Sequence, residues 1–564
     1  MPVCPRNHLS PMTGPAMQSD VRSAGGSVLF TLALAQFLMA LDSSVMNVSI
    51  ATVAKDLGTT VTGIQVAITL YTLVMAAFMI TGGKIGQILG RKRTFMIGCV
   101  VYGCGSLMTA LSPTLPFLLL GWSVLEGLGA ALILPAVVAL VATNFGPADR
   151  PRAYGLVMSA AAIAVAAGPL IGGLFTTYAS WRWVFAGEVL LVLVIVVMSR
   201  RMVDSPPQAG VRLDLIGTVL SAAGLGMVVF GIVRAGTWGF VQPKPEAPQW
   251  LGASPVIWLI LGGAVVITGF ILWESRRLQT GKGVLIDPHM LRVRGLQAGL
   301  ISFFFQYLLQ AGLFFVIPLF LSVALGLSAV ATGVRLLPLS ISILVAAAGV
   351  PRLFPAASPR RVVRVAFGLL AAGTIILVAA LDAGAGPEVV TWPLVLAGLG
   401  VGSLASQLGS VTVSSVPTSQ SGAVGGVQNT VMYLGASVGT ALSGTILIAV
   451  LTTTFLGNVA NDPAVPQEMS AQAQVQLSSG IPFVSDADLD ATLQKAGVPP
   501  DTAQAIAADN ASARLNGLRA ALSVLALLAL LALAATRRLP TTQPGSDEIG
   551  SEPAGGEGLT PAAG

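Results

Sequence analysis

Charged residues are scarce in this sequence, and their scarcity excludes whole classes of function. Asp, Glu, Lys and Arg make up 10% of the 564 residues, against about 25% in typical soluble domains. Hydrophobic residues make up 54%. Such a chain leaves no room for a large soluble catalytic domain.

Residues that commonly build chemical sites are also few. The sequence has 3 Cys and 2 His; Cys99 and Cys104 fall in one apolar segment, and Cys4 lies near the N-terminus. This spacing predicts neither a disulfide framework nor a metal site. The sequence contains no Walker loop and no Ser/His/Asp arrangement. We therefore expect no cofactor, no ATP drive and no enzymatic activity.

Long apolar segments are what the chain has instead. A helix needs about 20 apolar residues to cross a bilayer, and fourteen segments reach that length. They lie near 28–50, 62–81, 94–112, 116–142, 152–178, 182–199, 213–233, 255–273, 297–323, 329–350, 362–381, 389–412, 422–451 and 515–536. The sequence therefore predicts an all-α polytopic membrane protein with fourteen transmembrane helices.

The placement of basic residues predicts the orientation. With the N-terminus in the cytoplasm, most of the 30 Lys and Arg residues fall in inner loops and tails, as the positive-inside rule requires. Both termini are then cytoplasmic. The net charge of +6 is explained by the lipid surface, so we expect no nucleic-acid partner. Arg outnumbers Lys heavily, and Ala, Gly and Val dominate the composition, which indicates a bacterial gene. We therefore expect the chain in the bacterial inner (cytoplasmic) membrane.

The segments group into two halves around an insert. We expect a cytoplasmic tail at 1–27, six helices at 28–199, two helices with flanking loops at 200–296, six helices at 297–536, and a disordered tail at 537–564. Repeated halves around a midplane site are common in transporters. The polar segment 452–513 would lie outside the cell. Within it, 486–496 and 500–512 predict short helices.

Two motifs contain glycines that permit close packing. The loop after the second segment contains Gly83 and then Gly90-Arg91-Lys92-Arg93, which allows a tight turn and a basic inner surface. From charge alone an ordinary inner loop explains it equally well. The fifth segment contains Gly168-Pro169-Leu170-Ile171-Gly172-Gly173. It fits either a simple packing kink or a functional motif.

These motifs, with three others, resemble the major facilitator superfamily. The loop resembles the signature Gly-x-Leu-Ala-Asp-x-x-Gly-Arg-Arg/Lys, and 168–173 resembles the Gly-Pro-x-x-Gly-Gly motif of its antiporters. Residues 41–48, 181–185 and 428–439 resemble stretches of its fourteen-span drug:proton antiporters. The resemblance covers about 28–536. It implies the major facilitator fold, two six-helix halves plus two inserted helices.

The sequence also departs from that family. The acid of the loop signature falls on Gln87, and the Arg and Gln of the fourth-span pattern fall on Ser123 and Glu126. In the family the loop acid helps to latch the halves together, and the buried Arg is tied to proton movement. The resemblance therefore leaves open how this chain performs both tasks.

Three acids inside apolar segments are the predicted proton-coupling and substrate-coupling site. Asp42, Glu126 and Glu188 would each cost about 2.5–3.5 kcal/mol at midmembrane, so such residues normally have a function. The alternative for each is a structural hydrogen bond between helices. Substrate-pocket candidates are Asn47, Gln65, Tyr71, Arg335, Gln428 and Asn429. Arg335 would pair with a buried acid or extend outward to the interface, and helix packing is the alternative for the other five.

The sequence as a whole predicts a proton-coupled exporter of drug-like, cationic amphiphilic compounds that works by alternating access. Its partners would be a small-molecule substrate, protons and the bilayer, and we expect a monomer. Two alternatives stay open. One is an exporter of an endogenous metabolite or lipid, and the other is a non-transporting membrane receptor or scaffold.

Overall fold

The chain is helical almost throughout in the computed structural model, which describes residues 15–146, 149–204, 207, 212–244, 247–354, 356–382, 384–415, 421–477 and 481–539. The structure confirms the all-α class, because no strand occurs within those ranges. Most of the predicted tails, 1–14 and 540–564, lies outside the described residues. The remainder of the first tail, from Pro15, already belongs to the first helix.

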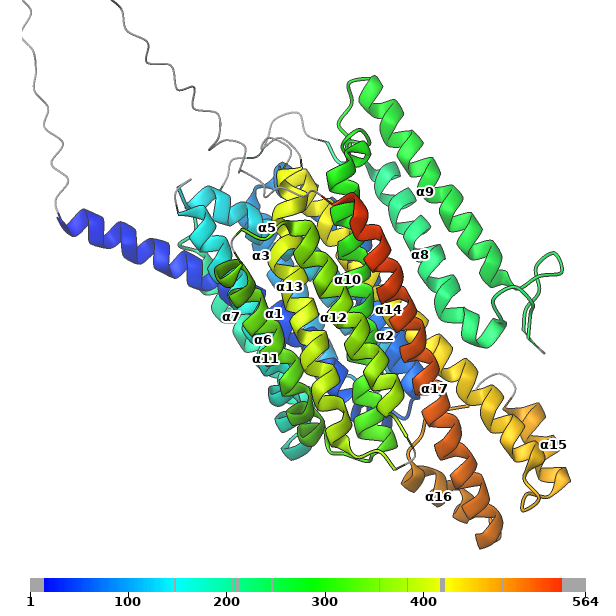
Figure 1. The fold of residues 1–564 in the computed structure, drawn as a ribbon. Helices are drawn as coiled ribbons and strands as arrows, with labels where there is room; N and C mark the ends of the chain where they lie inside the picture. The colour runs from blue at the N-terminus through cyan, green and yellow to red at the C-terminus, as the bar shows by residue number, and fades with distance from the viewer. Residues whose placement is uncertain are drawn as a thin grey trace, which may run out of the picture.

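In chain order the membrane helices form two groups of six with a pair between them, and this inserted pair lies at one side of the bundle (Figure 1). The first group is α1 (Pro15–Asp56), α2 (Val61–Leu89), α3 (Arg91–Ala110), a continuous span of α4 (Leu115–Leu118), the π-helix η1 (Leu119–Glu126) and α5 (Gly127–Asn144), then α6 (Arg150–Tyr178) and α7 (Arg182–Ser199). The inserted pair is α8 (Leu215–Trp238) and α9 (Pro255–Gln279).

The second group follows a short 3-10 turn, η2 (Met290–Arg292). It is α10 (Arg294–Leu319) continued by the π-helix η3 (Phe320–Ala324), α11 (Ala329–Leu353), α12 (Pro359–Ala380), α13 (Thr391–Ser414) after the 3-10 turn η4 (Pro387–Val390), α14 (Ser421–Asn461) and α17 (Pro500–Ala535), which ends in the 3-10 turn η6 (Thr536–Arg538). Between α14 and α17 lie α15 (Gln467–Gln476) and α16 (Asp486–Lys495).

Each of the fourteen predicted segments falls on a helix, but a count of fourteen membrane spans is not confirmed. Among the described residues, 12 helices are long and apolar enough to cross a membrane, or up to 13 if the bent helix α6 counts as one span. The remaining segment corresponds to α3. It begins with Arg91-Lys92-Arg93 and contains glycines and hydroxyl side chains, which lower its mean hydropathy. The expected short helix at 500–512 is also wrong, because these residues form the start of α17.

The two groups repeat the same neighbour pattern. In each, the first span packs on the fifth, the second and third on the fourth, and the third on the sixth: α1 on α6 and α10 on α14, for example. The groups meet along two seams, α2 with α14 and α6 with α11. The repetition supports the proposed division into halves with boundaries near 199 and 297.

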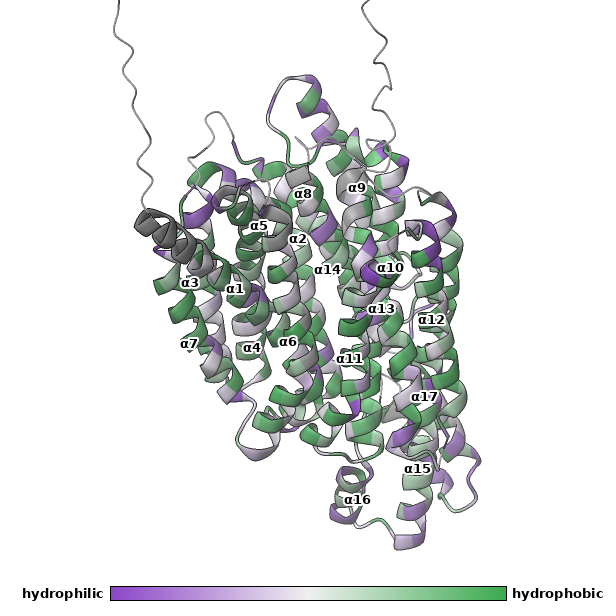
Figure 2. Ribbon diagram, turned by 60° about the vertical axis from the view of Figure 1, so that its left-hand side comes forward, coloured by the Kyte–Doolittle hydropathy of each residue, from purple (hydrophilic) through white to green (hydrophobic). Residues whose placement is uncertain are grey.

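The outer surface of the bundle is apolar between two polar ends (Figure 2). Exposed large side chains on α7 include Leu190, Leu193 and Val197, and those on α17 include Leu527 and Leu531. Side chains of this kind are stable against lipid tails rather than water. The exposed apolar surface therefore fits a chain embedded in a bilayer.

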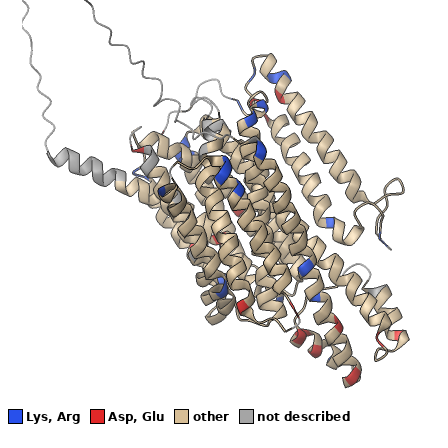
Figure 3. Cartoon of the chain, viewed as in Figure 1, with Lys and Arg blue, Asp and Glu red and all other residues tan. Residues whose placement is uncertain are grey.

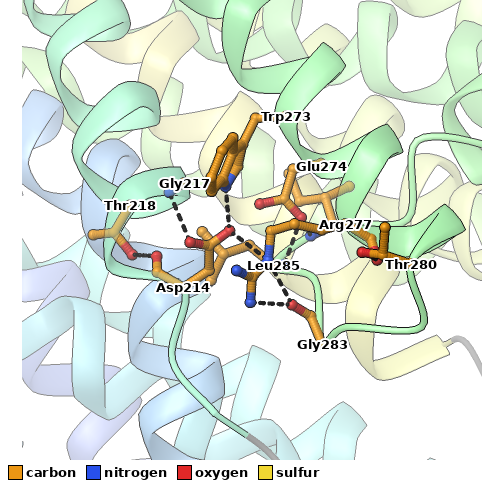
Figure 4. A network of polar contacts seen from close by, with 10 residues as sticks. Asp214, Gly217, Thr218, Trp273, Glu274, Arg277, Thr280, Gly283 and Leu285 are labelled. Carbon is orange, nitrogen blue, oxygen red and sulfur yellow. Dashed lines mark hydrogen bonds and ion pairs between the residues drawn. The ribbon is translucent and has the colours of Figure 1, made fainter.

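The inserted pair lies against the α2–α14 seam and is closed at one end by buried polar contacts (Figure 4). Asp214 caps α8 by accepting from the Gly217 amide at 3.1 Å, and it also accepts from the Trp273 indole at 2.8 Å and pairs with Arg277 at 3.1 Å. Glu274, fully buried, accepts from the Leu285 amide at 2.7 Å. These contacts tie both the start of α8 and the loop after α9 to the last turns of α9.

Charge separates the two ends of the bundle (Figure 3). Acidic residues gather around α16 and the start of α17, at one end of the bundle. Lys55 at the end of α1 pairs with Asp488 of α16, so the Arg91–Arg93 run, which follows α2, lies at the opposite end. We propose that the end with Arg91–Arg93 is cytoplasmic, because basic residues favour the inner side of a membrane.

This orientation makes a labelling prediction. A single cysteine in place of Asp490, an exposed residue of α16, should react with an impermeant maleimide on intact cells, whereas one in place of the exposed Arg93 should react only after permeabilisation. Equal expression of the two variants is the control. Labelling of the Arg93 variant alone in intact cells would reverse the proposed orientation.

Candidate functional site

The three predicted acids come together inside the first six-helix group. Asp42 lies on α1, Glu126 at the end of η1 and Glu188 on α7, and their side chains are 0%, 0% and 1% exposed. One carboxylate oxygen from each lies within 4.8 Å of the others. We call these three residues the carboxyl cluster. Carboxylate oxygens at this spacing could hold protons or a metal ion.

Helix α3 supplies hydroxyl donors to two of the acids. Thr109 donates to Glu126 Oε1 at 3.1 Å or to its own helix, while Ser106 and Tyr102 donate to Glu188 Oε2 at 3.1 and 3.3 Å. Glu126 Oε2 and Glu188 Oε1 remain without a partner. These donors are all neutral, so they orient the carboxyl groups without fixing their charge.

Trp122 supplies the donor to Asp42. Its indole Nε1 donates to Asp42 Oδ1 at 2.8 Å, and Asp42 Oδ2 has no partner. The indole ring stacks on Tyr71 of α2, with ring centroids 5.0 Å apart and planes inclined by 7°. Trp122 therefore joins an acid on α1 to an aromatic ring on α2.

Local backbone features make room for this arrangement. A β-carbon on Gly105 would lie 2.6 Å from Glu126 Cγ and 2.7 Å from the carbonyl oxygen of Gly121, so only glycine fits there. The π-helix η1 joins residues five apart. Trp122 and Glu126, four residues apart, lie on nearly the same face of this span and are both buried. Single π turns occur often at functional sites.

A central cavity of about 210 Å³ lies between the two six-helix groups. Side chains from α1, α2, η1, α6, α10 and α14 line it. They are neutral and include several aromatic and amide groups, among them Gln36, Asn47, Tyr71, Trp122, Tyr307, Gln310 and Tyr433. Both groups of helices thus contribute, as expected of a substrate site in a transporter built from repeats.

The Trp122–Tyr71 stack lies between the central cavity and the carboxyl cluster. Both rings line the cavity, and Trp122 reaches Asp42 on its other side. No acid of the cluster is among the described residues that line the cavity. A substrate in the cavity would therefore contact the rings and not the carboxyl groups.

The six predicted pocket residues fall into two sets. Asn47 and Tyr71 line the central cavity. Gln65, Arg335, Gln428 and Asn429 do not. Gln65 instead donates to the carbonyl oxygens of Thr440 and Ala441 across the α2–α14 seam, at 3.3 and 3.0 Å.

Gln428 and Arg335 also lie apart from the central cavity. Gln428 Oε1 accepts from Thr412 at 2.6 Å, a contact between α13 and α14. Arg335, half-buried on α11, makes no ion pair with any described acid. Of the two alternatives for Arg335, the pair with a buried acid is not present among the described residues.

The basic loop at 83–93 contains no acidic residue, and an acid from elsewhere in the chain contacts it. Asp204, after α7, accepts from the Lys92 amide at 2.9 Å at the start of α3. Arg91 donates to the Gly83 carbonyl oxygen at 3.1 Å, and Gly90 adopts φ +100°, a left-handed conformation that favours glycine. Asp204 thus lies where an acid favours a helix N-terminus.

The glycines of the 168–173 motif lie at helix contacts. A side chain on Gly172 would lie 3.0 Å from Val45 of α1, and one on Gly173 would lie 2.6 Å from the Ala329 carbonyl oxygen of α11. Gly168 faces Ser44 of α1, and Gly333 of α11 faces the Pro169 carbonyl oxygen. The motif therefore lets α6 approach both α1 and the second group closely.

The comparisons with known proteins agree with these features. The family description "Major Facilitator Superfamily" matches residues 32–440. The puromycin resistance protein pur8 of Streptomyces alboniger is 32% identical over 77% of this chain and 84% of its own length. A probable actinorhodin transporter of Streptomyces coelicolor is 29% identical over 74% and 71%.

Solved structures show the same fold at low identity. A peptide transporter bound to sulfate has a TM-score of 0.55 at 14% identity, over 92% of this chain and 99% of its own. A bacterial homologue of the lysosomal transporter Spinster, inward-facing and unoccupied, has a TM-score of 0.54 at 14% identity, over 92% and 98%. These similarities support the fold alone.

The tight contact at Gly105 makes a stability prediction. Gly105→Ala should lower the free energy of unfolding by about 1–3 kcal/mol, because the added methyl group overpacks the Glu126 side chain. Thermal unfolding in detergent measures it. Gly187→Ala on α7, where a β-carbon meets nothing within 4 Å, is the matched control and should not destabilise. Equal melting of both variants would show that Gly105 does not set the space for Glu126.

Proposed function

This chain belongs to the Major Facilitator Superfamily, and on that basis we propose that it is a proton-driven antiporter that exports drug-like compounds across the bacterial cytoplasmic membrane. It is a transporter and not an enzyme, as its family and fold indicate. The curated relatives are named for puromycin resistance, actinorhodin transport and cephamycin export, and the resistance and export names support the outward direction.

The observation that carries the proposal is the carboxyl cluster without a buried cation. Two carboxylates whose oxygen atoms lie within 4.8 Å of each other would repel by about 3 kcal/mol or more at an effective dielectric constant of about 20. None of the described Lys, Arg or His side chains forms an ion pair with the cluster. Protons are the simplest species that can neutralise it, and changes in proton occupancy would then accompany transport.

Trp122 replaces one role of the arginine that the family carries at the next position. An arginine at Ser123 would hold an acid ionised, whereas the Trp122 indole donates a hydrogen bond and no charge. Ser123 instead donates to the Ala67 carbonyl oxygen at 2.8 Å. A neutral donor lets Asp42 gain and lose a proton without leaving a buried cation unpaired.

The central cavity fits aromatic compounds, including cationic amphiphiles. Rings such as Tyr71, Trp122, Tyr307 and Tyr433 line it, and aromatic faces attract both flat apolar rings and cations. We propose that the substrate binds against these rings. Coupling to the acids would then pass through the Trp122–Asp42 hydrogen bond rather than through direct competition for a carboxylate.

Alternating access would use the two seams between the helix groups. The α2–α14 and α6–α11 contacts are closely packed around glycines and backbone groups, which suits small rocking motions. We propose that Asp204 and the basic loop hold one end of the first group together during this motion. A single chain contains both halves, so a monomer suffices.

The alternatives differ in their dependence on the acids. An exporter of an endogenous metabolite or lipid would use the same cluster with another occupant of the central cavity. A receptor or scaffold would tolerate neutralisation of Asp42, because it moves nothing against a gradient. Flux measurements separate the scaffold from both kinds of exporter.

The acids make the first functional prediction. Asp42→Asn should abolish active efflux, and Glu126→Gln should weaken cation transport and its voltage dependence but spare neutral substrates. Each exchanged proton contributes about 1.36 kcal/mol per pH unit, and each net charge moved adds about 2.3 kcal/mol per 100 mV. Uptake into inverted vesicles, with pH gradient and voltage set independently, measures both. If both variants match the parent protein under every gradient, the carboxyl cluster is not the coupling site.

The indole makes the second functional prediction. Trp122→Phe keeps a ring against Tyr71 but removes the donor to Asp42, a loss of about 1–3 kcal/mol for a buried acceptor. We expect proton-driven ethidium uptake into inverted vesicles to fall about tenfold while ethidium binding changes little. Trp183→Phe, at a largely exposed position on α7, is the control. Unchanged uptake by the Trp122 variant would remove the indole from the coupling path.

A further inference from the structure

A second and larger cavity, of about 390 Å³, lies at the end of the bundle that carries α16. We call it the outer cavity, because the proposed orientation places this end outside the cell. The end of α1, the start of α2, η3 with the following loop, and residues 482–485 with Asp488 line it. Its lining combines hydroxyl groups such as Thr52, Thr60 and Ser322 with apolar groups such as Val61 and Phe483.

The outer cavity continues the line of the central cavity. On α1 the central cavity is lined from Gln36 to Asn47, and the outer cavity from Val48 to Lys55. On α10 and η3 the same change occurs between Phe314 and Ser322. Because the same helices line both cavities in the same order along their length, the two cavities follow one path across the membrane.

Residues 481–488 form a roof segment over the outer cavity that three helices hold in place. The Ile481 amide donates to Thr452 of α14 at 3.0 Å. Arg514 of α17, 2% exposed, donates to the Val484 carbonyl oxygen at 2.7 Å and pairs with Asp486. A buried arginine is stable only when partners accept its hydrogen bonds and balance its charge. A loop that only connected two spans would not need such an arginine, so this contact indicates that the roof segment has a fixed position.

The third attachment crosses to the other six-helix group. Lys55 of α1 pairs with Asp488 at 3.2 Å, and the Ser485 hydroxyl donates to the same carboxylate at 2.7 Å. The Ser485 hydrogen bond, followed by Lys55, lowers the pKa of Asp488, so this carboxylate is ionised at neutral pH. The two side chains are 78% and 51% exposed. Exposed ion pairs contribute little to stability, so this contact opens easily.

We propose that the outer cavity is a second substrate-binding site on the export path, which takes the compound after it leaves the central cavity and releases it when the Lys55–Asp488 pair opens. The inference rests on the proposed function. The lining selects apolar compounds that carry hydroxyl or amino groups, since hydroxyl side chains both donate and accept. The segment 452–513 is then part of the transport path, although its polarity in the sequence indicates only an exposed loop.

Thiol protection tests the site with ethidium as the probe. In a background of Cys4→Ser, Cys99→Ala and Cys104→Ser, single cysteines are placed by Ser322→Cys in the outer cavity, Ala311→Cys in the central cavity and Ala487→Cys on the exposed face of the roof segment. At ten times its Kd, ethidium should slow alkylation of the first two about tenfold, because only the unoccupied fraction reacts. Ala487→Cys should be unaffected.

The outcomes separate this inference from the proposed function. Protection of Ala311→Cys without protection of Ser322→Cys would overturn the outer site and leave the exporter intact. Failure to protect either, together with no ethidium efflux by the parent protein, would overturn both. Protection of Ser322→Cys and not of Ala487→Cys supports a bound compound beneath the roof segment.

Charge reversal tests the roof independently. Lys55→Glu places a like charge opposite Asp488, so alkylation of Ser322→Cys from outside should accelerate and ethidium efflux should change. The double variant Lys55→Asp with Asp488→Lys restores opposite charges and should return both rates toward those of the parent. Lys495→Glu, an exposed reversal on the same α16, is the control. If Lys55→Glu leaves the alkylation rate unchanged, the ion pair does not close the outer cavity.

Discussion

Three carboxyl groups share one buried space, and among the described residues no cationic side chain shares it with them. Much of the first six-helix group is arranged to satisfy this constraint. Helix α3 faces the acids with hydroxyl groups, Gly105 leaves room for Glu126, and η1 buries Trp122 and Glu126, four residues apart, on one face. Each of these features orients or makes room for a carboxyl group without adding a charge, so the charge of the cluster depends on how many protons it binds.

The sequence predicts the spans and the acids for a simple reason. The length of an apolar segment and the free-energy cost of a charge within it depend on that segment alone. Both can therefore be predicted without knowing which helices are in contact. The partners of the acids are different. Tyr102, Ser106, Thr109 and Trp122 look like ordinary residues of apolar spans, and only the packing of α3 and η1 on α1 and α7 gives them a role.

Where the structure differs from what the sequence suggests, the differences have physical causes as well. Gln65 has the polarity of a pocket residue, but it satisfies its amide across a helix seam. The weak apolarity of α3 reflects its position beside the acids, where small and hydroxyl side chains are needed. Helix α17 begins at Pro500, well before the apolar segment expected at 515–536. The polar residues from Asp501 onward continue the same helix toward its N-terminus, so they do not form a separate short helix. Asp204 lies far in sequence from the loop that it completes, so no local pattern reveals it.

The inserted pair makes the two seams of an otherwise repeated bundle unequal. Helix α8 lies against both α2 and α14, whereas α6 and α11 carry exposed apolar side chains such as Ile163 and Ile341. In a bilayer, protein would cover the α2–α14 seam, and lipid would contact the exposed side chains of α6 and α11. Bilayer thickness and lateral pressure would then act on the two sides of the molecule to different degrees. A change of lipid would therefore affect motion at one seam more than at the other.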